Sequence, residues 1–332
     1  MNNLLEVTNL SVSYHQVPVV QNVSLSLAQG EIAGLVGESG CGKSTFLRTL
    51  MMLTDDAAHV TSGSILFEGQ DLTQKSSEQL RKLRGAEISM IFQDSSLACN
   101  PVQTIGYHFW ETMNSHGKKH SKKECYAKAA ALLTQLRMTD PERILKSYPF
   151  ELSGGMNQRV GIALAMINNP KFILADEPTS ALDVTVQMQV LHELSQLRER
   201  YGTAMMVVTH SIGVVAQLCD TVGVMYGGRL VEWGPCQAVL EHPAHPYTKA
   251  LIAAIPQGDG AEPVGIPGMP PDFTNPFPGC PYGPRCPHRT AACEAAMPEQ
   301  SWVTENHWVC CIRWNELKEG GYHGAVGTER TI

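Results

Sequence analysis

The glycine-rich stretch at residues 37–45 constrains the fold of this chain more than any other feature. It reads G-E-S-G-C-G-K-S-T, follows an apolar run at 31–36 that is typical of a buried strand, and precedes a run at 46–53 that is typical of a helix. This strand–loop–helix order is the context in which G-x-x-x-x-G-K-S/T forms a P-loop, which binds nucleotide phosphates. The glycines let backbone N–H groups turn toward a polyphosphate, and the helix directs its positive end at the same anion.

The residue types in this loop predict which atoms a nucleotide contacts. Lys43 supplies a positive charge for the β- and γ-phosphates, and the Ser44 hydroxyl can ligate Mg²⁺. The predicted contacts in the loop are Gly37, Ser39, Gly40, Cys41, Gly42, Lys43, Ser44 and Thr45.

The bulk composition excludes several other classes of protein. The net charge of −7 gives no overall basic signal for nucleic acid, although it leaves room for a local basic patch. No apolar run approaches the roughly 20 residues that a membrane-spanning helix needs. The first ten residues, MNNLLEVTNL, lack the basic start and apolar block of a signal peptide, so we expect the protein to stay in the cytosol.

The order of patterns along the chain predicts an α/β fold. Residues 4–12 and 23–27 alternate apolar and polar side chains, as half-buried strands do. Residues 97–150 instead carry apolar side chains at helical spacing, which indicates a helical insertion, and residues 160–168 also read as helical. Continuous apolar runs at 171–176 and 204–209 predict strands of a sheet that is covered on both faces.

The composition changes at about residue 256. Ten of the 20 prolines fall between residues 263 and 298. Proline opposes both helix and sheet, so we expect this segment to contain neither. It is predicted to be either a disordered tail or a loop-rich module that is held together by something other than a core.

Two further features add chemistry to the P-loop. An apolar strand ends in Asp176 and Glu177, where Asp176 can hold Mg²⁺ and Glu177 can act as general base on an attacking water. A solvated acidic pair at a strand end is the plainer alternative. His210 follows the run at 204–209, where it can contact a γ-phosphate, although a lone histidine there is often structural.

With these motifs in order, residues 1–255 resemble the ATP-binding cassette (ABC) ATPases. Residues 152–158 (LSGGMNQ) match the family signature, residues 180–183 (SALD) match its D-loop, Gln93 matches its Q-loop and His210 matches its switch histidine. The resemblance implies a P-loop NTPase with a RecA-like core, an N-terminal antiparallel β part and an inserted helical subdomain at about 97–168. Residues 256–332 would form a Cys- and Pro-rich C-terminal extension.

The same resemblance implies roles for individual residues. Glu177, His210 and Gln93 would be catalytic, while Ser44, Gln93 and Asp176 would hold Mg²⁺. Tyr14 would stack on the adenine. Further nucleotide contacts would come from the signature motif and the D-loop, through Ser153, Gly154, Gly155 and Asp183.

A narrower resemblance links the chain to ATPases of peptide/nickel/opine importers. It rests on residues 91–101, 176–187 and 241–256, and the chain departs from those relatives at Ser95 and Asn157. The resemblance implies an ATP-driven motor at the cytoplasmic face of the inner membrane. It would work with a second ATPase, expected to be a paralogue, with two permease subunits and with an extracytoplasmic solute-binding protein.

Two other functions fit the sequence less well. A soluble ABC ATPase that acts on DNA or ribosomes commonly fuses two cassettes or inserts long coiled coils, and this chain has neither pattern. A regulatory protein with an inactive cassette would be expected to lack some of the catalytic residues, which are all present here. The transported solute is left open among peptides, nickel and opines or other metallophores.

Five cysteines crowd into the last quarter of the chain. Cys280, Cys286 and Cys293 are followed by the adjacent Cys310 and Cys311. The gaps are wider than in common zinc sites and differ from those of ferredoxins. The segment resembles the C-terminal part of dipeptide-permease ATPases, some of which hold a [4Fe–4S] cluster. The resemblance implies such a cluster on Cys280, Cys286, Cys293 and Cys311, with Cys310 as the alternative fourth ligand. Zinc and free thiols are the other possibilities.

Overall fold

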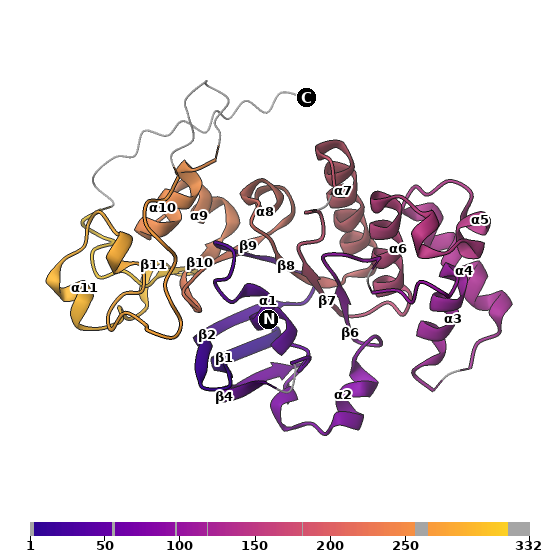
Figure 1. Cartoon of the computed structure of the whole chain (residues 1–332), viewed down its shortest axis with the longest axis horizontal. Helices are drawn as coiled ribbons and strands as arrows, with labels where there is room; N and C mark the ends of the chain where they lie inside the picture. The colour runs from indigo at the N-terminus through magenta and orange to yellow at the C-terminus, as the bar shows by residue number, and fades with distance from the viewer. Residues whose placement is uncertain are drawn as a thin grey trace.

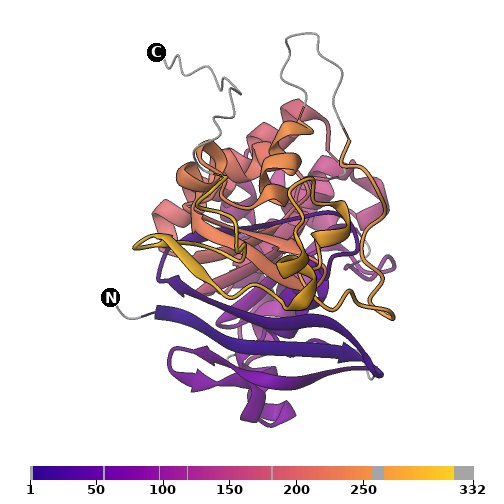
Figure 2. The ribbon, with the colours of Figure 1, turned by 90° about the vertical axis from the view of Figure 1, so that its left-hand side faces the viewer.

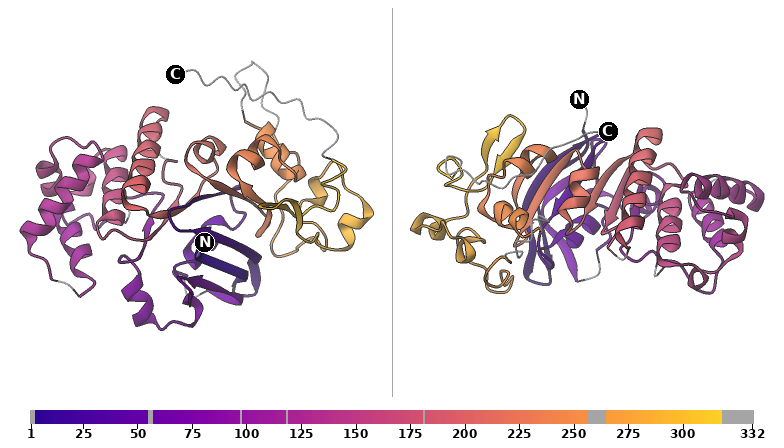
Figure 3. Two further views of the ribbon diagram at one scale, coloured as in Figure 1. Left: turned by 180° about the vertical axis from the view of Figure 1, so that it is seen from behind. Right: turned by 90° about the horizontal axis from the view of Figure 1, so that it is seen from above.

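The computed structural model describes residues 3–54, 57–96, 98–117, 119–180, 182–255 and 265–317. Two β-sheets lie at the centre, a group of helices lies at one end, and residues 265–317 lie at the other (Figures 1 and 3). Parts of the predicted C-terminal extension (256–264 and 318–332) and Ala181 of the predicted D-loop lie outside the described residues. Within these ranges, no helix is both long enough and apolar enough to cross a bilayer.

The larger sheet has eight strands in the order β11-β12-β10-β9-β3-β8-β7-β6. Its strands are β3 (Ile32–Val36), β6 (Ile88–Ile91), β7 (Phe172–Asp176), β8 (Ala204–Val208), β9 (Thr221–Tyr226), β10 (Arg229–Pro235), β11 (Ser301–Thr304) and β12 (His307–Val309). The five strands from β9 to β6 run parallel. All residues of β3, β7 and β8 are buried, as expected for parallel strands covered on both faces. The predicted α/β class is confirmed.

The smaller sheet is antiparallel, with four strands in the order β2-β1-β4-β5 (Figure 2). Its strands are β1 (Asn3–Tyr14), β2 (Val17–Ala28), β4 (Ala58–Phe67) and β5 (Gln70–Asp71). In β2, Val23, Leu25 and Leu27 are buried while Ser26 is exposed, so the predicted alternation is confirmed. The buried side chains of this sheet share one core with Phe46 of the helix that follows the P-loop.

Helices surround the larger sheet and form the group at one end. They are α1 (Lys43–Thr49), α2 (Ser77–Leu83), α3 (Ile105–Asn114), α4 (Lys122–Gln135), α5 (Pro141–Lys146), α6 (Gly154–Met166), α7 (Val184–Tyr201), α8 (Ile212–Leu218), α9 (Cys236–Glu241), α10 (Pro246–Ala253) and α11 (Ala291–Ala295). Short 3₁₀ turns are η1 (Leu72–Gln74), η2 (Pro149–Glu151) and η3 (Gly283–Arg285). The helix predicted at 160–168 begins earlier, at Gly154, because the Ser153 hydroxyl caps it by accepting from the Met156 N–H.

The expectation that the C-terminal segment contains neither helix nor sheet is wrong. The hairpin of β11 and β12 extends the larger sheet, with β12 beside β10, and α11 is a short helix. The physical reason is local, because the prolines end at Pro298 and residues 301–309 (SWVTENHWV) are rich in aromatic and β-branched residues.

A buried carboxylate joins this hairpin to the rest of the chain. Glu232 on β10 is fully buried and accepts from the backbone N–H groups of Ala244 and His245 at 2.7 and 3.0 Å. The Nε2 atom of His307 on β12 lies 2.8 Å from the same carboxylate. Both oxygens therefore have partners, as a buried charge requires.

Candidate active site

The site begins where parallel strands end at one edge of the larger sheet. The P-loop follows β3, the two carboxylates follow β7, and His210 lies shortly after β8. These strands are neighbours in the order β3-β8-β7, so their carboxyl ends bring the three segments together. The sheet thus assembles residues that are far apart in the sequence.

The backbone of the P-loop has the conformation that its glycines allow. Gly42 has a φ of 103° and directly precedes α1, and a Cβ atom there would lie 2.7 Å from the Val19 carbonyl oxygen. A larger residue is therefore excluded both by backbone strain and by space. The loop delivers Lys43 and Ser44 as the first residues of the helix.

Lys43 is buried within the loop. Its Nζ donates to the carbonyl oxygens of Gly37 and Glu38, both at 2.8 Å, and lies 3.6 Å from the Cys41 sulfur. Burial raises the pKa of the Cys41 thiol, and the nearby Lys43 opposes that shift. The ammonium group is therefore fixed in the loop that would surround the phosphates.

Ser44 and Asp176 meet across 132 positions of sequence. The Ser44 hydroxyl donates to Asp176 Oδ1 at 2.9 Å. Asp176 is buried, and desolvation raises its pKa, while the bond from Ser44 and the charge of Arg48 act in the opposite direction. A hydroxyl and a carboxylate oxygen are ligands that Mg²⁺ prefers, so this pair fits the predicted metal position.

Glu177 and His210 form a second contact at the same edge. His210 Nδ1 lies 2.9 and 3.0 Å from the two carboxylate oxygens of Glu177. Glu177 has a φ of 48°, in the left-handed region that a residue other than glycine adopts rarely. Strained backbone of this kind clusters at functional sites, but eight other non-glycine residues among those described also have a positive φ, so the conformation alone does not mark the site. The sequence predicted that His210 contacts a phosphate, whereas the structure places it on the predicted general base.

A cavity of about 780 Å³ brings these side chains together. It is lined by Arg48, Gln93, Asp176, Glu177, Ser180 and His210, among others. Sequence reasoning missed Arg48, whose guanidinium lies 3.8 Å from Asp176. Its position four residues after Ser44 on α1 could have indicated that it lies on the same face.

Other predicted nucleotide contacts lie away from this cavity. Ser153 and Gly154 are exposed at the start of α6, and Gly155 is partly exposed. Asp183 is an exposed cap of α7, where it accepts from the Val186 N–H, and Tyr14 is the last residue of β1. None of these residues lines the cavity that contains Asp176 and Glu177.

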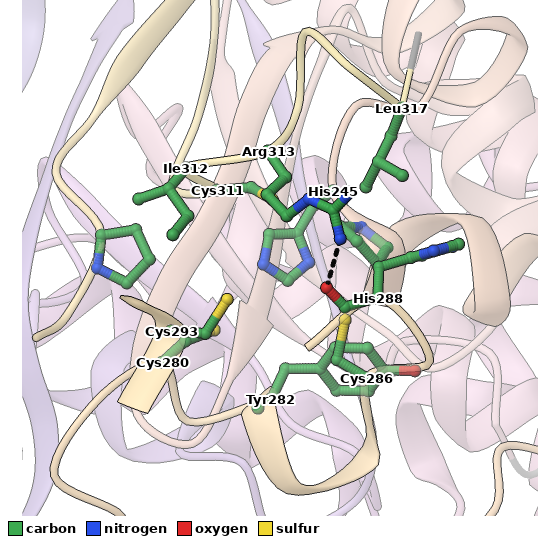
Figure 4. Close-up of a pocket in the computed structure, with 13 residues that line it drawn as sticks. His245, Cys280, Tyr282, Cys286, His288, Cys293, Cys311, Ile312, Arg313 and Leu317 are labelled. Carbon is green, nitrogen blue, oxygen red and sulfur yellow. Dashed lines mark hydrogen bonds between the residues drawn. The ribbon is translucent and has the colours of Figure 1, made fainter. Parts of the chain in front are cut away.

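Four of the five C-terminal cysteines line one small cavity, which we call the thiol pocket. They are Cys280, Cys286, Cys293 and Cys311, and His245 and Tyr282 complete part of its wall (Figure 4). Cys310 lies outside this pocket and packs into the core with Trp308. The structure therefore places Cys311, and not Cys310, beside the other three thiols. The sequence spacing alone did not decide between these two cysteines.

The thiol pocket is narrow, and burial disfavours ionisation of the Cys280 and Cys311 thiols. Its free volume is about 20 Å³, room for about one water molecule. Burial raises the pKa values of Cys280 and Cys311 to about 11. Among the described residues, no group of three or more His, Cys, Asp or Glu side chains is arranged to hold a metal ion. The predicted [4Fe–4S] cluster is therefore not supported by this geometry and stays a prediction.

Comparisons with known proteins agree with the motifs and the fold. The family profile described as "ABC transporter" matches residues 20–180, and "Oligopeptide/dipeptide transporter, C-terminal region" matches residues 231–293. The dipeptide transport ATP-binding protein DppD of Bacillus subtilis is 43% identical over 94% of this chain and 95% of its own length. The oligopeptide transport ATP-binding protein OppD of Haemophilus influenzae is 42% identical over 95% of this chain and all of its own.

A solved structure shares the fold of most of the chain. The cassette MJ0796, in a dimeric post-hydrolysis state bound to ADP and Pi, superposes with a TM-score of 0.63 and is 27% identical. The match covers 70% of this chain and 98% of that one.

Proposed function

We propose, because the chain belongs to the dipeptide and oligopeptide group of ABC transporter ATP-binding proteins, that it is the ATP-hydrolysing subunit of a peptide importer. The observation that carries the proposal is the edge of the sheet where Lys43, Ser44, Asp176, Glu177 and His210 converge. Phosphate-binding, Mg²⁺-binding and proton-accepting groups lie there within one site.

The proposed roles follow from the contacts. Lys43 binds the β- and γ-phosphates, and Ser44 and Asp176 hold Mg²⁺, which neutralises charge on the phosphates when it is bound. Glu177 accepts a proton from the attacking water, and His210 orients that carboxylate through their direct contact. Gln93 lines the same cavity, where its amide can contact the attacking water and the metal.

The exposed signature motif suits a different partner. Ser153 and the first N–H groups of α6 form an exposed, positive helix end that does not line the cavity of Asp176 and Glu177. We propose that these groups, with Asp183 nearby, complete the ATP site of a second ATPase subunit in a head-to-tail pair. The similar cassette MJ0796 is dimeric, which supports the pairing of two such subunits. We further propose that the second subunit is a paralogue.

The membrane partners would dock beside the Q-loop. A cavity of about 300 Å³ lies there between the Q-loop and α3, lined by Phe92, Ser95, Cys99, His108 and Glu111, among others. Phe92 and Val102 are exposed apolar side chains in this region. We propose that two permease subunits bind here, which would place the chain at the cytoplasmic face of the membrane and link it to a solute-binding protein.

Peptide-stimulated hydrolysis tests the proposed function. The chain is co-expressed with its neighbouring permease genes and its partner ATPase, purified as a complex, and reconstituted with its solute-binding protein. We expect a short peptide to raise the ATPase rate at least severalfold, and nickel salts or opines to have no effect. Stimulation by nickel or an opine instead of peptides would contradict the peptide assignment.

We propose, second, that the thiol pocket binds a [4Fe–4S] cluster. The proposal starts from one observation, that Cys280, Cys286, Cys293 and Cys311 line the same pocket, and four thiols are the usual donor set of such a cluster. The pocket would have to widen to admit the cluster, because its free volume is only about 20 Å³. The sequence gaps between these cysteines are wider than those of common zinc sites, which favours a cluster over zinc. When bound, the cluster would supply the positive charge that these buried thiols need to ionise.

Absorbance of anaerobically purified protein tests this proposal. We expect a brown preparation with a broad sulfur-to-iron band, which is lost in Cys286→Ser and Cys311→Ser. Cys219→Ser, a change of a partly exposed cysteine outside the pocket, is the control and should keep the band. A colourless preparation without iron, after anaerobic iron–sulfur reconstitution, would contradict the cluster.

A further inference from the structure

A side chain from the C-terminal segment binds the P-loop directly. Arg285 makes a two-pronged ion pair with Glu38, with Nη1–Oε2 and Nη2–Oε1 distances of 2.6 and 3.0 Å. The two residues are 247 positions apart. Glu38 follows Gly37 in the loop, and its own carbonyl oxygen accepts from Lys43. The contact therefore reaches the loop that surrounds the predicted phosphate position.

Arg285 is held firmly on its own side of this contact. Its Nε donates to the Pro267 carbonyl oxygen at 2.8 Å, and its Nη2 donates to the Ile266 carbonyl oxygen at 3.1 Å. Its Nη1 also donates to the Tyr226 hydroxyl at 3.2 Å. Only 5% of the Arg285 side chain is exposed. These hydrogen bonds hold the planar guanidinium in one position, so its positive charge beside Glu38 is fixed in place.

A second contact fixes the same residue of the loop. The Tyr247 hydroxyl accepts from the Glu38 backbone N–H at 2.9 Å. The rings of Tyr247, Tyr226 and Tyr282 pack against one another, with centroids 4.5 to 5.3 Å apart. Tyr282 also lines the thiol pocket. The loop and the thiol pocket are therefore joined by a continuous set of buried aromatic contacts.

The turn that carries Arg285 lies between two thiols of that pocket. It is η3 (Gly283–Arg285), with Cys280 before it and Cys286 directly after it. The Gly283 N–H donates to the Cys280 carbonyl oxygen at 2.8 Å, and the Cys286 N–H donates to that of Gly283 at 3.2 Å. A rearrangement of these thiols would therefore move the guanidinium that Glu38 binds.

The charge on Glu38 explains why its ion pair with Arg285 affects ATP binding. A carboxylate in an anion-binding loop repels a polyphosphate, and the Glu38 side chain is only 24% exposed, so water screens it incompletely. Arg285 cancels that charge and draws the carboxylate toward itself. We propose that Arg285 is a positioning residue that neutralises Glu38 and fixes the P-loop, so that the C-terminal segment sets the affinity for ATP. This inference rests on the proposed assignment of the P-loop to ATP.

A double-mutant cycle on the full chain tests the proposal. ATP affinity is measured by calorimetry with Mg²⁺ for Arg285→Gln, Glu38→Gln and the double variant, and kcat and KM are measured for the same proteins. We expect Arg285→Gln to weaken ATP binding by about 5- to 20-fold, the lower part of the usual range for coupling between sites. KM should rise while kcat at saturating ATP stays within about twofold, because Arg285 does not contact the reacting atoms.

Removing the carboxylate should reverse the defect. With Glu38→Gln added, we expect the double variant to recover to within about threefold of the wild-type affinity, because no unpaired charge is left. A double variant as weak as Arg285→Gln alone would mean that Arg285 is merely structural. Wild-type affinity in Arg285→Gln would also overturn the proposal. If Arg285→Gln does not fold, the double variant provides the test. A folded double variant that binds ATP more than tenfold more weakly than wild type would overturn the proposal.

Two further variants separate this inference from its premise. Arg289→Gln removes a cation from the same segment that pairs with Glu294 instead, and it should bind ATP as wild type does. Lys43→Ala tests the P-loop itself. Weak binding in Lys43→Ala with normal binding in Arg285→Gln overturns only the role of Arg285, whereas normal binding in Lys43→Ala overturns the ATP assignment of the loop.

Discussion

Glu177→Gln is expected to bind ATP as wild type does and to hydrolyse it about 10²- to 10⁴-fold more slowly, the usual contribution of a positioned general base. The amide has nearly the same shape as the carboxylate but cannot accept the proton of the attacking water. The change is confined to the side chain, so the left-handed backbone at this position should persist. Steady-state phosphate release and ATP titration of the same preparation measure the two effects separately.

A matched change elsewhere controls for this prediction. Glu199 is an exposed glutamate on α7, outside the cavity, so Glu199→Gln should hydrolyse ATP at the wild-type rate. If Glu177→Gln turns over as fast as Glu199→Gln, Glu177 is not the general base. The acidic pair at the end of β7 would then be a solvated strand end.

Lys43→Ala is expected to weaken ATP binding by about 10- to 100-fold, since a hydrogen bond to a charged group is worth roughly 1.5–3 kcal/mol. Lys43 also bonds the carbonyl oxygens of Gly37 and Glu38, so its removal could loosen the loop. Lys43→Met keeps the apolar length without the charge and should lose nearly as much affinity. Calorimetric titration with ATP and Mg²⁺ measures both variants.

The control for this prediction is a lysine that is exposed on the surface. Lys82 on α2 is 70% exposed and lies 3.9 Å from Glu78. Lys82→Ala should leave ATP affinity unchanged. Unaltered affinity in Lys43→Ala would show that the loop does not hold the phosphates.

Local patterns predicted the central sheet and most of the candidate site. The apolar runs at β3, β7 and β8 were long enough to identify buried strands, and the glycine spacing identified the loop before α1. Asp176 could be placed beside Ser44 because both follow parallel strands, whose ends share one edge. Each strand and each motif is encoded by a short continuous stretch of residues, which is why sequence reasoning recovered it.

Features that depend on distant segments could not be read from the sequence. The His210–Glu177 contact requires β8 to lie next to β7, and strand order does not appear in any local pattern. The ion pair of Arg285 with Glu38 requires the C-terminal segment to fold back onto the P-loop. The proline count of the whole segment led to the wrong prediction for the β11–β12 hairpin. The prolines end at Pro298, before these strands begin, so they do not oppose strand formation there.

We propose that ATP joins two ATPase subunits across their P-loops and signature motifs. The most direct test of this proposal is the size of the Glu177→Gln protein, mixed with its natural partner ATPase and Mg²⁺, by chromatography with light scattering. We predict ATP-dependent pairs that disappear without nucleotide and when Ser153→Arg blocks the exposed start of α6. Subunits that stay single at saturating ATP, although calorimetry shows the site to be filled, would contradict the account.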